Sequence, residues 1–268
     1  MTRLFVTDLD QTFLNSERQF NVPRFSAILD QLDKRGDQFA IASGRDENWV
    51  RNKFGKLVNR MHLVTGNGAT WRVKCSDELH VRNIDASALK KLEEILISDT
   101  FETISIVAFS ADNMYKLAGL QQLPENMQDY MAQVYPNMAT VDHLTDISEP
   151  LTSVTGIFPP IHSEEAISLI DDNNLPLHAT TSGYGTVDIL AESVNKATSL
   201  SMLIDQVDLA PEDLTAFGDG MNDLEMMQLA GQVYIMPNSD DRLFGRGYNV
   251  VAKDSDHDGV LETLEKIM

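Results

Sequence analysis

The stretch Phe5–Ser16, FVTDLDQTFLNS, decides the fold, because it joins a short apolar run to two closely spaced aspartates. Residues 3–8, RLFVTD, have the pattern of a buried strand in a parallel sheet. Asp8 and Asp10 then lie at the carboxyl end of that strand, where open parallel sheets bind their ligands. Such a pair can hold a hard cation together, or act as nucleophile and general acid/base. The structural alternative is that Asp8 ends the strand and Asp10 shapes a turn.

Helix and strand patterns alternate after these aspartates. A helix is predicted at residues 23–36, because the segment starts with a proline, ends at Gly36 and has one apolar face. Such alternation with short apolar strands is typical of an α/β domain with a parallel sheet. The apolar face consists of Phe25, Ile28, Leu29 and Leu32, and the next elements are a strand at 37–43, a helix at 45–55 and a strand at 60–69 that leads into a glycine turn.

The pattern changes at about residue 83 and returns after residue 195. Between these points, helices and paired strands are mixed in a way that is typical of an α+β domain. The predicted elements of this insert are a helix at 85–98, a hairpin at 101–119 turning at 111–113, a helix at 124–136, a strand at 153–160, a helix at 163–173, and two strands within 175–192 turning at Ser182–Gly183. After it we predict helices at 196–208, 221–231 and 259–268, and strands at 214–219, 232–237 and 247–253.

The simplest organisation is an α/β fold in which a Rossmann-like parallel-sheet core is interrupted by an inserted α+β domain. We expect the core to comprise residues 1–82 and 191–268, and the insert to comprise residues 83–190. A chain of 268 residues is long enough for two such domains with their own cores.

The composition indicates a globular and strongly acidic protein. Apolar residues make up 43% of the chain, and the net charge is −20, from 21 basic and 41 acidic residues. Such a surface repels nucleic-acid phosphates and anionic lipid, so we expect neither as a partner. The chain has no apolar stretch long enough for a membrane span, and its first residues lack the apolar run of a signal peptide. The single cysteine, Cys75, fits a reducing compartment, and we expect a cytoplasmic location.

The segment Gly218–Asp223, GDGMND, follows another predicted strand. Asp219 comes directly after the strand, and Asn222 and Asp223 open the next predicted helix. Helix capping is the structural alternative for these residues. Asp219 is nevertheless expected at the same sheet edge as Asp8, where several carboxylates together would need a metal or another cation.

Two further positions suit the binding of an anion. Ser43 ends a third predicted strand, and its hydroxyl could form a phosphate cradle with the backbone amides of Gly44 and Arg45 at a helix N-terminus. Lys196 starts a helix, where its charge is unfavourable for the helix dipole, and a lysine in such a place often has an anionic partner. A simple N-cap for Ser43 and a solvated surface position for Lys196 are the alternatives.

Together these segments resemble the four motifs of the haloacid dehalogenase-like phosphohydrolases, in the same order. The insert before Lys196 is similar to the large cap of the Cof-type subgroup, so the resemblance implies an α+β cap domain that determines substrate specificity. The similarity covers essentially the whole chain. The matching motifs are Asp8–Thr12 (DLDQT), Ser43–Arg45 (SGR), Lys196 and Gly218–Asp223 (GDGMND), with further similar stretches at Asn67–Ala69, Met236–Ser239 and Asp258–Val260.

The resemblance implies a Mg²⁺-dependent phosphatase of small phosphorylated metabolites, with sugar phosphates as the expected class. Asp8 would attack the phosphorus and form an aspartyl-phosphate, while Asp10 would protonate the leaving oxygen and then activate water. The implied magnesium ligands are a carboxylate oxygen of Asp8, the main-chain carbonyl of Asp10, and Asp219, with Asp223 in support. The implied phosphate-binding residues are Thr12, Ser43, Gly44, Lys196 and Asn222, and Lys196 also counts as catalytic.

Two residues depart from the motifs of the family. Gln11 stands where a glycine usually follows the second aspartate, and Ala197 stands where a glycine usually follows the lysine. Neither change removes a catalytic group, so the expected activity is unchanged, although Gln11 adds a side chain beside the nucleophile. The presence of Asp10 favours phosphatase chemistry over dehalogenation.

Other functions remain as alternatives, and the sequence does not specify an oligomeric state. A sugar phosphomutase of the same superfamily would also phosphorylate Asp8, whereas a sensor of phosphorylated ligands would have little need for Asp10. The segment Asp254–Glu265, DSDHDGVLETLE, matches the calcium-loop pattern D-x-[DN]-x-[DN]-G-x5-E. A calcium hand needs a helix on each side of its loop, but residues 247–253 are predicted to be a strand. We therefore expect a strand-to-helix turn, whose aspartates favour the N-terminus of the last helix.

Overall fold

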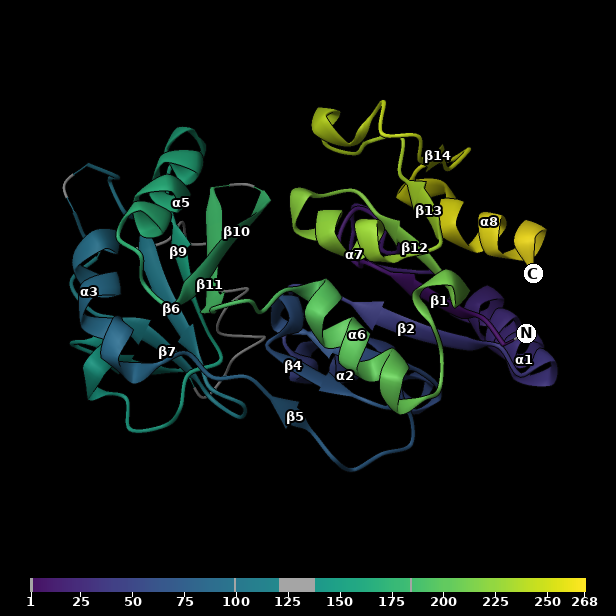
Figure 1. Ribbon diagram of the computed structural model, residues 1–268, viewed down its shortest axis with the longest axis horizontal. Helices are drawn as coiled ribbons and strands as arrows, with labels where there is room; N and C mark the ends of the chain where they lie inside the picture. The colour runs from purple at the N-terminus through teal and green to yellow at the C-terminus, as the bar shows by residue number, and fades with distance from the viewer. Residues whose placement is uncertain (1, 99, 121–137, 184) are drawn as a thin grey trace. The chain divides into compact units, whose positions relative to one another are not determined.

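The computed structural model describes residues 2–98, 100–120, 138–183 and 185–268. It divides into two units, each with its own sheet (Figure 1). Unit 1 comprises Met1–His80 and Asn195–Met268, and unit 2 comprises Val81–Val194. The α/β fold with an inserted α+β domain is thereby confirmed.

Unit 1 is built on an eight-stranded sheet in the order β14-β13-β12-β1-β2-β3-β4-β5. β1 pairs in parallel with β12 on one side and β2 on the other, and the pairs β12–β13, β13–β14 and β2–β3 are also parallel. The carboxyl ends of β1, β2 and β12 therefore meet at one edge of the sheet. The strands are β1 (Leu4–Thr7), β2 (Gln38–Ala42), β3 (His62–Thr65), β4 (Thr70–Arg72, antiparallel to β3), β5 (His80–Val81), β12 (Leu214–Gly218), β13 (Gln232–Ile235) and β14 (Asn249–Val250).

Helices pack on both faces of this sheet (Figure 1). On one face, Ala40 and Ala42 of β2 belong to a buried cluster with side chains of α6 and α7. On the other face, Phe39 of β2 contacts Phe25 of α1, with ring centroids 5.1 Å apart. Both faces of the strands are thus buried, which explains their continuous apolar pattern. The helices are α1 (Val22–Arg35), α2 (Glu47–Phe54), α6 (Lys196–Gln206), α7 (Leu224–Leu229) and α8 (Gly259–Ile267), which packs against α1.

The sequence of α1 contains the signals for its start and its end. The side chain of Asn21, the N-cap, accepts a hydrogen bond from the backbone N–H of Arg24 at 3.2 Å. Gly36 ends the helix with φ of +74°, in the left-handed region that favours glycine. The predicted apolar face is confirmed, since Phe25, Ile28, Leu29 and Leu32 are all buried.

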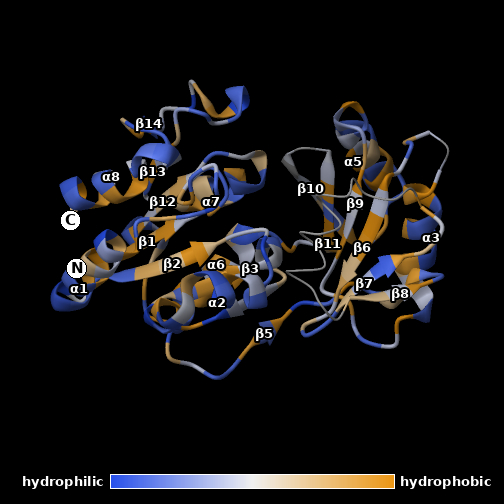
Figure 2. Cartoon of the chain, turned by 180° about the vertical axis from the view of Figure 1, so that it is seen from behind, coloured by the Kyte–Doolittle hydropathy of each residue, from blue (hydrophilic) through white to orange (hydrophobic). Residues whose placement is uncertain are grey.

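Unit 2 contains a six-stranded sheet in the order β10-β11-β9-β6-β7-β8, and α3 and α5 contribute to its buried core. The predicted hairpin is confirmed, because β6 and β7 pair with Phe109 opposite Met114. Figure 2 shows β6 mainly in hydrophobic colours, as expected for a strand that contributes to a core. The elements are β6 (Ser105–Phe109), β7 (Met114–Leu117), β8 (Ala139–Val141), β9 (Ser153–Ile157), β10 (Leu177–Gly183), β11 (Thr186–Ala191), α3 (Ala86–Leu96) and α5 (Ser163–Asp172).

The short elements differ most from the prediction. β4, β5 and β8 were not predicted, and the predicted strand at 247–253 is reduced to β14. The predicted helix at 221–231 begins as a 3-10 turn at Met221–Asp223. β10 continues through Gly183, so the turn between β10 and β11 lies later than predicted. Such short elements depend on their neighbours more than on a local pattern. The predicted helix at 124–136 lies entirely within residues 121–137, outside the described residues.

The helices in the described ranges can be compared with the length and apolarity that a membrane span requires. None of them is both long enough and apolar enough to cross a bilayer.

Candidate active site

Three carboxylates meet at the carboxyl edge of the sheet in unit 1. Asp8 follows β1, and its backbone N–H donates to the carbonyl of Phe217 in the neighbouring β12 at 2.9 Å. Asp219 follows β12, and Asp223 follows four residues later. Each of the three aspartates offers a carboxylate oxygen, and these atoms all lie within 4.8 Å of one another. We refer to Asp8, Asp219 and Asp223 as the carboxylate cluster.

Lys196 is the cation of this cluster. It is the first residue of α6 and is only 1% exposed. Its Nζ donates to Oδ1 of Asp8 and to Oδ1 of Asp223, both at 2.6 Å. A lysine at a helix N-terminus and out of contact with water requires such anionic partners. The alternative of a solvated surface lysine was therefore wrong.

The electrostatics of the carboxylate cluster favour additional positive charge. Burial raises the pKa of Asp8 well above its ordinary value, against the opposing charge of Lys196, and repulsion from Asp223 and Asp219 raises it further. Burial and repulsion from Asp223 raise the pKa of Asp219 to about 7. Burial alone would lower the pKa of Lys196, but Asp223 and Asp8 outweigh it and hold that pKa above its ordinary value. Carboxylates in excess over the one ammonium are a donor set that fits a divalent cation such as Mg²⁺.

The loop after β12 fixes the positions of Asp219 and Asp223. Oδ2 of Asp223 accepts hydrogen bonds from the backbone N–H groups of Asp219 and Gly220, each at 3.0 Å. Thr12 donates to Oδ1 of Asp219 at 2.5 Å. A Cβ on Gly218 would lie 2.6 Å from Oδ2 of Asp223, so this position has no room for a side chain. The glycines of GDGMND thus let the backbone turn close to the carboxylate.

Asp10 lies beside the carboxylate cluster but is held by arginines. Arg45 donates from Nε to Oδ2 of Asp10 at 2.8 Å and from Nη2 to Oδ1 at 2.9 Å. The Nε of Arg18 lies 3.8 Å from Oδ1 of Asp10. The Asp10 side chain is 36% exposed, in contrast to the buried Asp8. The two aspartates of the DLD motif therefore lie in different environments, as a division of roles between them would require.

Ser43 and Gly44 follow β2 at the same edge of the sheet. The Ser43 hydroxyl accepts a hydrogen bond from the backbone N–H of Arg45 at 3.2 Å, so the N-cap-like contact is present. The carbonyl of Ser43 accepts from the backbone N–H of Asn67 at 2.9 Å. Asn222 donates to Oδ1 of Asn67 at 3.1 Å, and a Cβ on Gly44 would lie 3.2 Å from Nδ2 of Asn67. Asn67 thus joins the loops after β2, β3 and β12.

The structure brings together most of the residues that the sequence singled out. Asp8, Lys196, Asp219 and Asp223 form direct contacts or a shared cluster, and Thr12 contacts Asp219. Ser43, Gly44 and Asn222 are connected to one another through Asn67. The Asp10 side chain is absent from the carboxylate cluster, which is compatible with a ligand role for its main-chain carbonyl only.

Sequence reasoning missed three residues of this region. The side chains of Arg45 and Arg18 contact Asp10, whereas the sequence indicates a role only for the backbone amide of Arg45. For Asn67, the sequence shows only that it belongs to a stretch similar to one in the family. For Arg45, a long cation directly after a Ser–Gly pair at a strand end was the available signal. For Arg18, no local pattern indicates the contact.

The DSDHDGVLETLE segment does not have the arrangement of a calcium hand. It follows β14 rather than a helix, as predicted. Glu265, at the last ligand position, accepts hydrogen bonds from Arg24 at 2.9 and 2.7 Å, and Asp258 accepts from the same guanidinium at 3.1 Å. Asp256 accepts from the backbone N–H of Ser16 at 2.7 Å. These carboxylates fasten the last turn and α8 to the N-terminal segment of unit 1.

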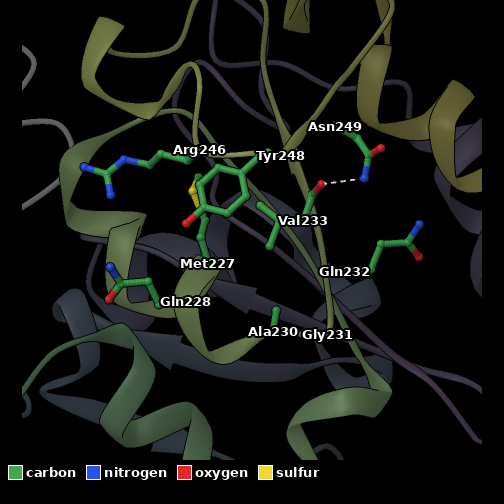
Figure 3. Close-up of a pocket in the computed structure, with 10 residues that line it drawn as sticks. Met227, Gln228, Ala230, Gly231, Gln232, Val233, Arg246, Tyr248 and Asn249 are labelled. Atoms are coloured by element: carbon green, nitrogen blue, oxygen red, sulfur yellow. Dashed lines mark hydrogen bonds between the residues drawn. The ribbon is translucent and has the colours of Figure 1, made fainter.

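A pocket of about 350 Å³ lies elsewhere in unit 1, between α7, β13 and β14 (Figure 3). Tyr248 packs there against a buried group that includes Met227 and Val233, and Asn249 donates to the carbonyl of Val233 at 3.0 Å. Its lining contains no carboxylate, so the pocket is not the candidate active site.

Comparison with known proteins agrees with this geometry. The sequence profile of the haloacid dehalogenase-like hydrolases matches residues 5–264. An HMP-PP phosphatase of an Enterobacter species is 30% identical over 244 residues, covering 89% of this chain and 85% of the relative. The 5-amino-6-(5-phospho-D-ribitylamino)uracil phosphatase of Escherichia coli is 24% identical, covering 99% and 96% of the two chains.

Solved structures share the fold. A Streptococcus mutans protein aligns with a TM-score of 0.89 at 26% identity, covering 99% of this chain and 98% of its own. A sugar phosphatase of haloacid dehalogenase subclass IIB aligns with a TM-score of 0.80 at 18% identity, covering 99% and 98%. The profile match spans nearly the whole chain, and the chain therefore belongs to the haloacid dehalogenase-like hydrolase family.

Proposed function

We propose that the protein is a Mg²⁺-dependent phosphatase that hydrolyses small phosphorylated metabolites through an aspartyl-phosphate on Asp8. The main support is the contact between Asp8 and the buried Lys196 at 2.6 Å, beside Asp219 and Asp223 at the carboxyl edge of the sheet. The family and the phosphatase names of its relatives support the same class of reaction.

In this proposal, Asp8 is the nucleophile. The ammonium of Lys196 holds one carboxylate oxygen of Asp8, which leaves the other oxygen free of that contact. Lys196 also neutralises charge between the anionic nucleophile and the anionic phosphoryl group. Phosphoryl transfer depends mainly on in-line positioning and on neutralisation of the phosphoryl oxygens, and these residues supply both.

Asp10 acts as the general acid and base. Its carboxylate is held in one orientation by Arg45 and is partly exposed, which leaves it accessible to a substrate. It donates a proton to that oxygen and then accepts one from the water that hydrolyses the aspartyl-phosphate.

The magnesium ion would be bound by a carboxylate oxygen of Asp8, the main-chain carbonyl of Asp10 and Asp219, with Asp223 in support. When bound, it would supply the positive charge that the carboxylate cluster lacks and would reduce the repulsion between Asp8 and the substrate. Ser43, the backbone amide of Gly44 and Lys196 would hold phosphoryl oxygens, and Thr12 and Asn222 would orient the surrounding side chains.

Residues 83–190 would form the cap that selects the substrate, with the turns at residues 182–185 and 112–113 as the first places to search for specificity. Sugar phosphates are the substrate class we favour. The Escherichia coli relative is named for a substrate with a phosphorylated ribityl chain, which supports a polyhydroxylated substrate. The exposed free thiol of Cys75 is compatible with our proposal of a cytoplasmic location.

The test is a screen of phosphorylated metabolites in the presence of Mg²⁺, with released phosphate as the readout. We expect turnover of sugar phosphates by the wild type, loss of turnover on chelation of the metal, and a loss of at least about a thousandfold in Asp8→Asn. Full turnover by Asp8→Asn would refute the proposal, and an isomerised sugar phosphate in place of free phosphate would instead identify a phosphomutase.

A further inference from the structure

Arg18, Arg45 and Lys53, hereafter the basic cluster, gather around Asp10. Arg45 makes two hydrogen bonds to the Asp10 carboxylate, and Arg18 lies 3.8 Å from it. Asp10 follows Asp8 by two residues, so these arginines lie next to the carboxylate cluster, and the charge of Asp10 also acts on Lys53. In a chain with a net charge of −20, the basic cluster is a local concentration of positive charge.

Arg18 lies in a turn that hydrogen bonds hold closed. The backbone N–H of Asn15 donates to the carbonyl of Gln19 at 2.9 Å, and that of Arg18 donates to the carbonyl of Asn15 at 2.8 Å. The Asn15 side chain accepts from the N–H groups of Gln19 and Glu17 at 2.7 and 3.1 Å. Arg18 has φ of +56°, which is unfavourable for a residue other than glycine. The turn therefore fixes the backbone position of Arg18 despite this cost.

One face of α2 orders the other two members of the basic cluster. The guanidinium carbon of Arg45 lies 4.7 Å from the ring centroid of Trp49. Lys53 follows Trp49 by four residues and therefore lies on the same face of the helix, one turn further along. The next residue, Phe54, stacks on Phe20 with ring centroids 4.6 Å apart. This contact holds the end of α2 against the segment that follows the Arg18 turn.

Lys53 lacks a compensating ion pair within the described residues, although it is half-buried. Burial lowers its pKa, the charge of Arg18 lowers it further, and Asp10 opposes both effects. The like charges of Arg18 and Lys53 repel each other. An anion placed between them would remove this repulsion.

We propose that the basic cluster binds a second phosphoryl group of the substrate, so that the preferred substrates have two phosphoryl groups. This inference rests on the proposed function, in which the first phosphoryl group lies at Asp8. Guanidinium groups match phosphate oxygens in geometry, and a lysine adds a mobile point charge. In this arrangement the carboxylate cluster binds the metal, and the basic cluster beside it binds the second phosphoryl group.

The test compares the binding of methylphosphonate with that of α,ω-diphosphonates of increasing methylene length, by calorimetry in the presence of Mg²⁺. Phosphonates are not hydrolysed, so the measurement does not depend on turnover. For the wild type, we expect the best diphosphonate to bind with one molecule per chain and about tenfold more tightly than methylphosphonate. The length of that diphosphonate reports the distance between the two phosphoryl sites.

Arg18→Gln and Lys53→Gln should each reduce this ratio of affinities about fivefold or more, because each removes one charged contact to the second phosphate. Lys53→Arg should retain the ratio. Lys56→Gln is the matched control, since Lys56 is exposed and follows α2, outside the basic cluster.

Three results would overturn the inference while leaving the proposed function intact. The diphosphonates could bind no more tightly than methylphosphonate, methylphosphonate could titrate to two molecules per chain, or the ratio could be unchanged in Arg18→Gln and Lys53→Gln. The second result would mean that the basic cluster binds a separate anion. If methylphosphonate does not bind and no metabolite releases phosphate, the proposed function fails and the inference fails with it.

Discussion

At the scale of single residues, Lys196 illustrates how a buried charge and its partners depend on one another. Its Nζ contacts Asp8 and Asp223, and all three side chains are largely withdrawn from water. An ion pair of this kind contributes little net stability relative to an apolar group, but removal of one partner leaves the others uncompensated. The position of Lys196 therefore matters to folding as well as to the proposed chemistry.

We predict that Lys196→Met lowers the free energy of unfolding by about 3–5 kcal/mol in metal-free buffer, because Asp8 and Asp223 lose their shared cation. Urea denaturation of the wild type and the variant gives this difference. Adding Asp8→Asn to Lys196→Met should recover part of the loss, since it removes one of the unpaired carboxylates. Equal stability of Lys196→Met and the wild type would contradict this account of the cluster.

His62 is a second buried titratable residue, remote from the carboxylates. Its Nδ1 accepts from the backbone N–H of Lys74 at 3.2 Å, so its Nε2 carries the proton and donates to Gln38 at 2.6 Å. Burial lowers the pKa of His62 from 6.5 to about 4, and the charge of Lys74 contributes to the same direction. The folded state therefore favours the neutral ring, and the stability that this ring provides is complete above pH 6.5 and decreases as the pH falls towards about 4.

We predict that the wild type loses about 2 kcal/mol more stability than His62→Gln between pH 7 and pH 5. Stability is lost because His62 of the unfolded chain binds a proton in this pH range, whereas the folded chain keeps the ring neutral. Denaturant titrations of both proteins at pH 7 and pH 5 measure this difference in lost stability. Groups other than His62 titrate in both proteins, so their contributions cancel. A difference of zero would show that His62 is not held neutral.

At the scale of secondary-structure elements, the connection between α1 and α8 accounts for the calcium-like motif. Arg24 of α1 binds Glu265 of α8 and Asp258 just before it, with the guanidinium at 2.7–3.1 Å from their oxygens. These contacts raise the pKa of Arg24 and lower that of Glu265. The acidic residues of the motif thus have an arginine as their counter-charge.

We predict that calorimetric titration of the wild type shows no micromolar calcium site at Asp254–Glu265. Glu265→Gln should lower the free energy of unfolding by only about 0.5–1 kcal/mol, and less at high salt, because the pair with Arg24 is partly exposed. Lys266→Gln is a suitable control, since Lys266 pairs within α8 and does not contact Arg24. Micromolar calcium binding that Glu265→Gln abolishes would restore the calcium hypothesis.

The elements with a strong periodic pattern could be predicted from the sequence. α1 is an example, since its apolar face, its proline near the start and its terminal Gly36 each indicate the same helix. β4 and β5 could not be predicted, because their few residues become strands only by pairing with the edge of a sheet that already exists. Local sequence contains no information about that pairing.

The same distinction applies to the candidate site. Asp8, Asp219 and Ser43 could be placed at one edge because each follows a predicted parallel strand. The contact of Arg18 with Asp10 could not, since it depends on a closed turn and on an unusual φ. Cations that reach the site only through tertiary contacts therefore cannot be predicted from the residues that follow predicted strands.

At the scale of the whole molecule, the chain combines a general negative charge with two local exceptions. A net charge of −20 repels polyanions in general, yet Lys196 and the basic cluster place positive charge at and beside the carboxylate cluster. The two units have separate sheets and separate buried cores. The carboxylate cluster consists of residues of unit 1.

The role of Asp8 can be tested most directly by rapid-quench mass spectrometry of Asp10→Asn with p-nitrophenyl phosphate and Mg²⁺. The p-nitrophenolate group leaves without protonation, so the first step proceeds, whereas hydrolysis of the aspartyl-phosphate lacks its general base. We predict that the peptide containing Asp8 gains the mass of one phosphoryl group, and that the same peptide of Asp8→Asn does not. Release of p-nitrophenol and phosphate with no modified peptide, at a rate unaffected by Asp8→Asn, would contradict the proposed mechanism.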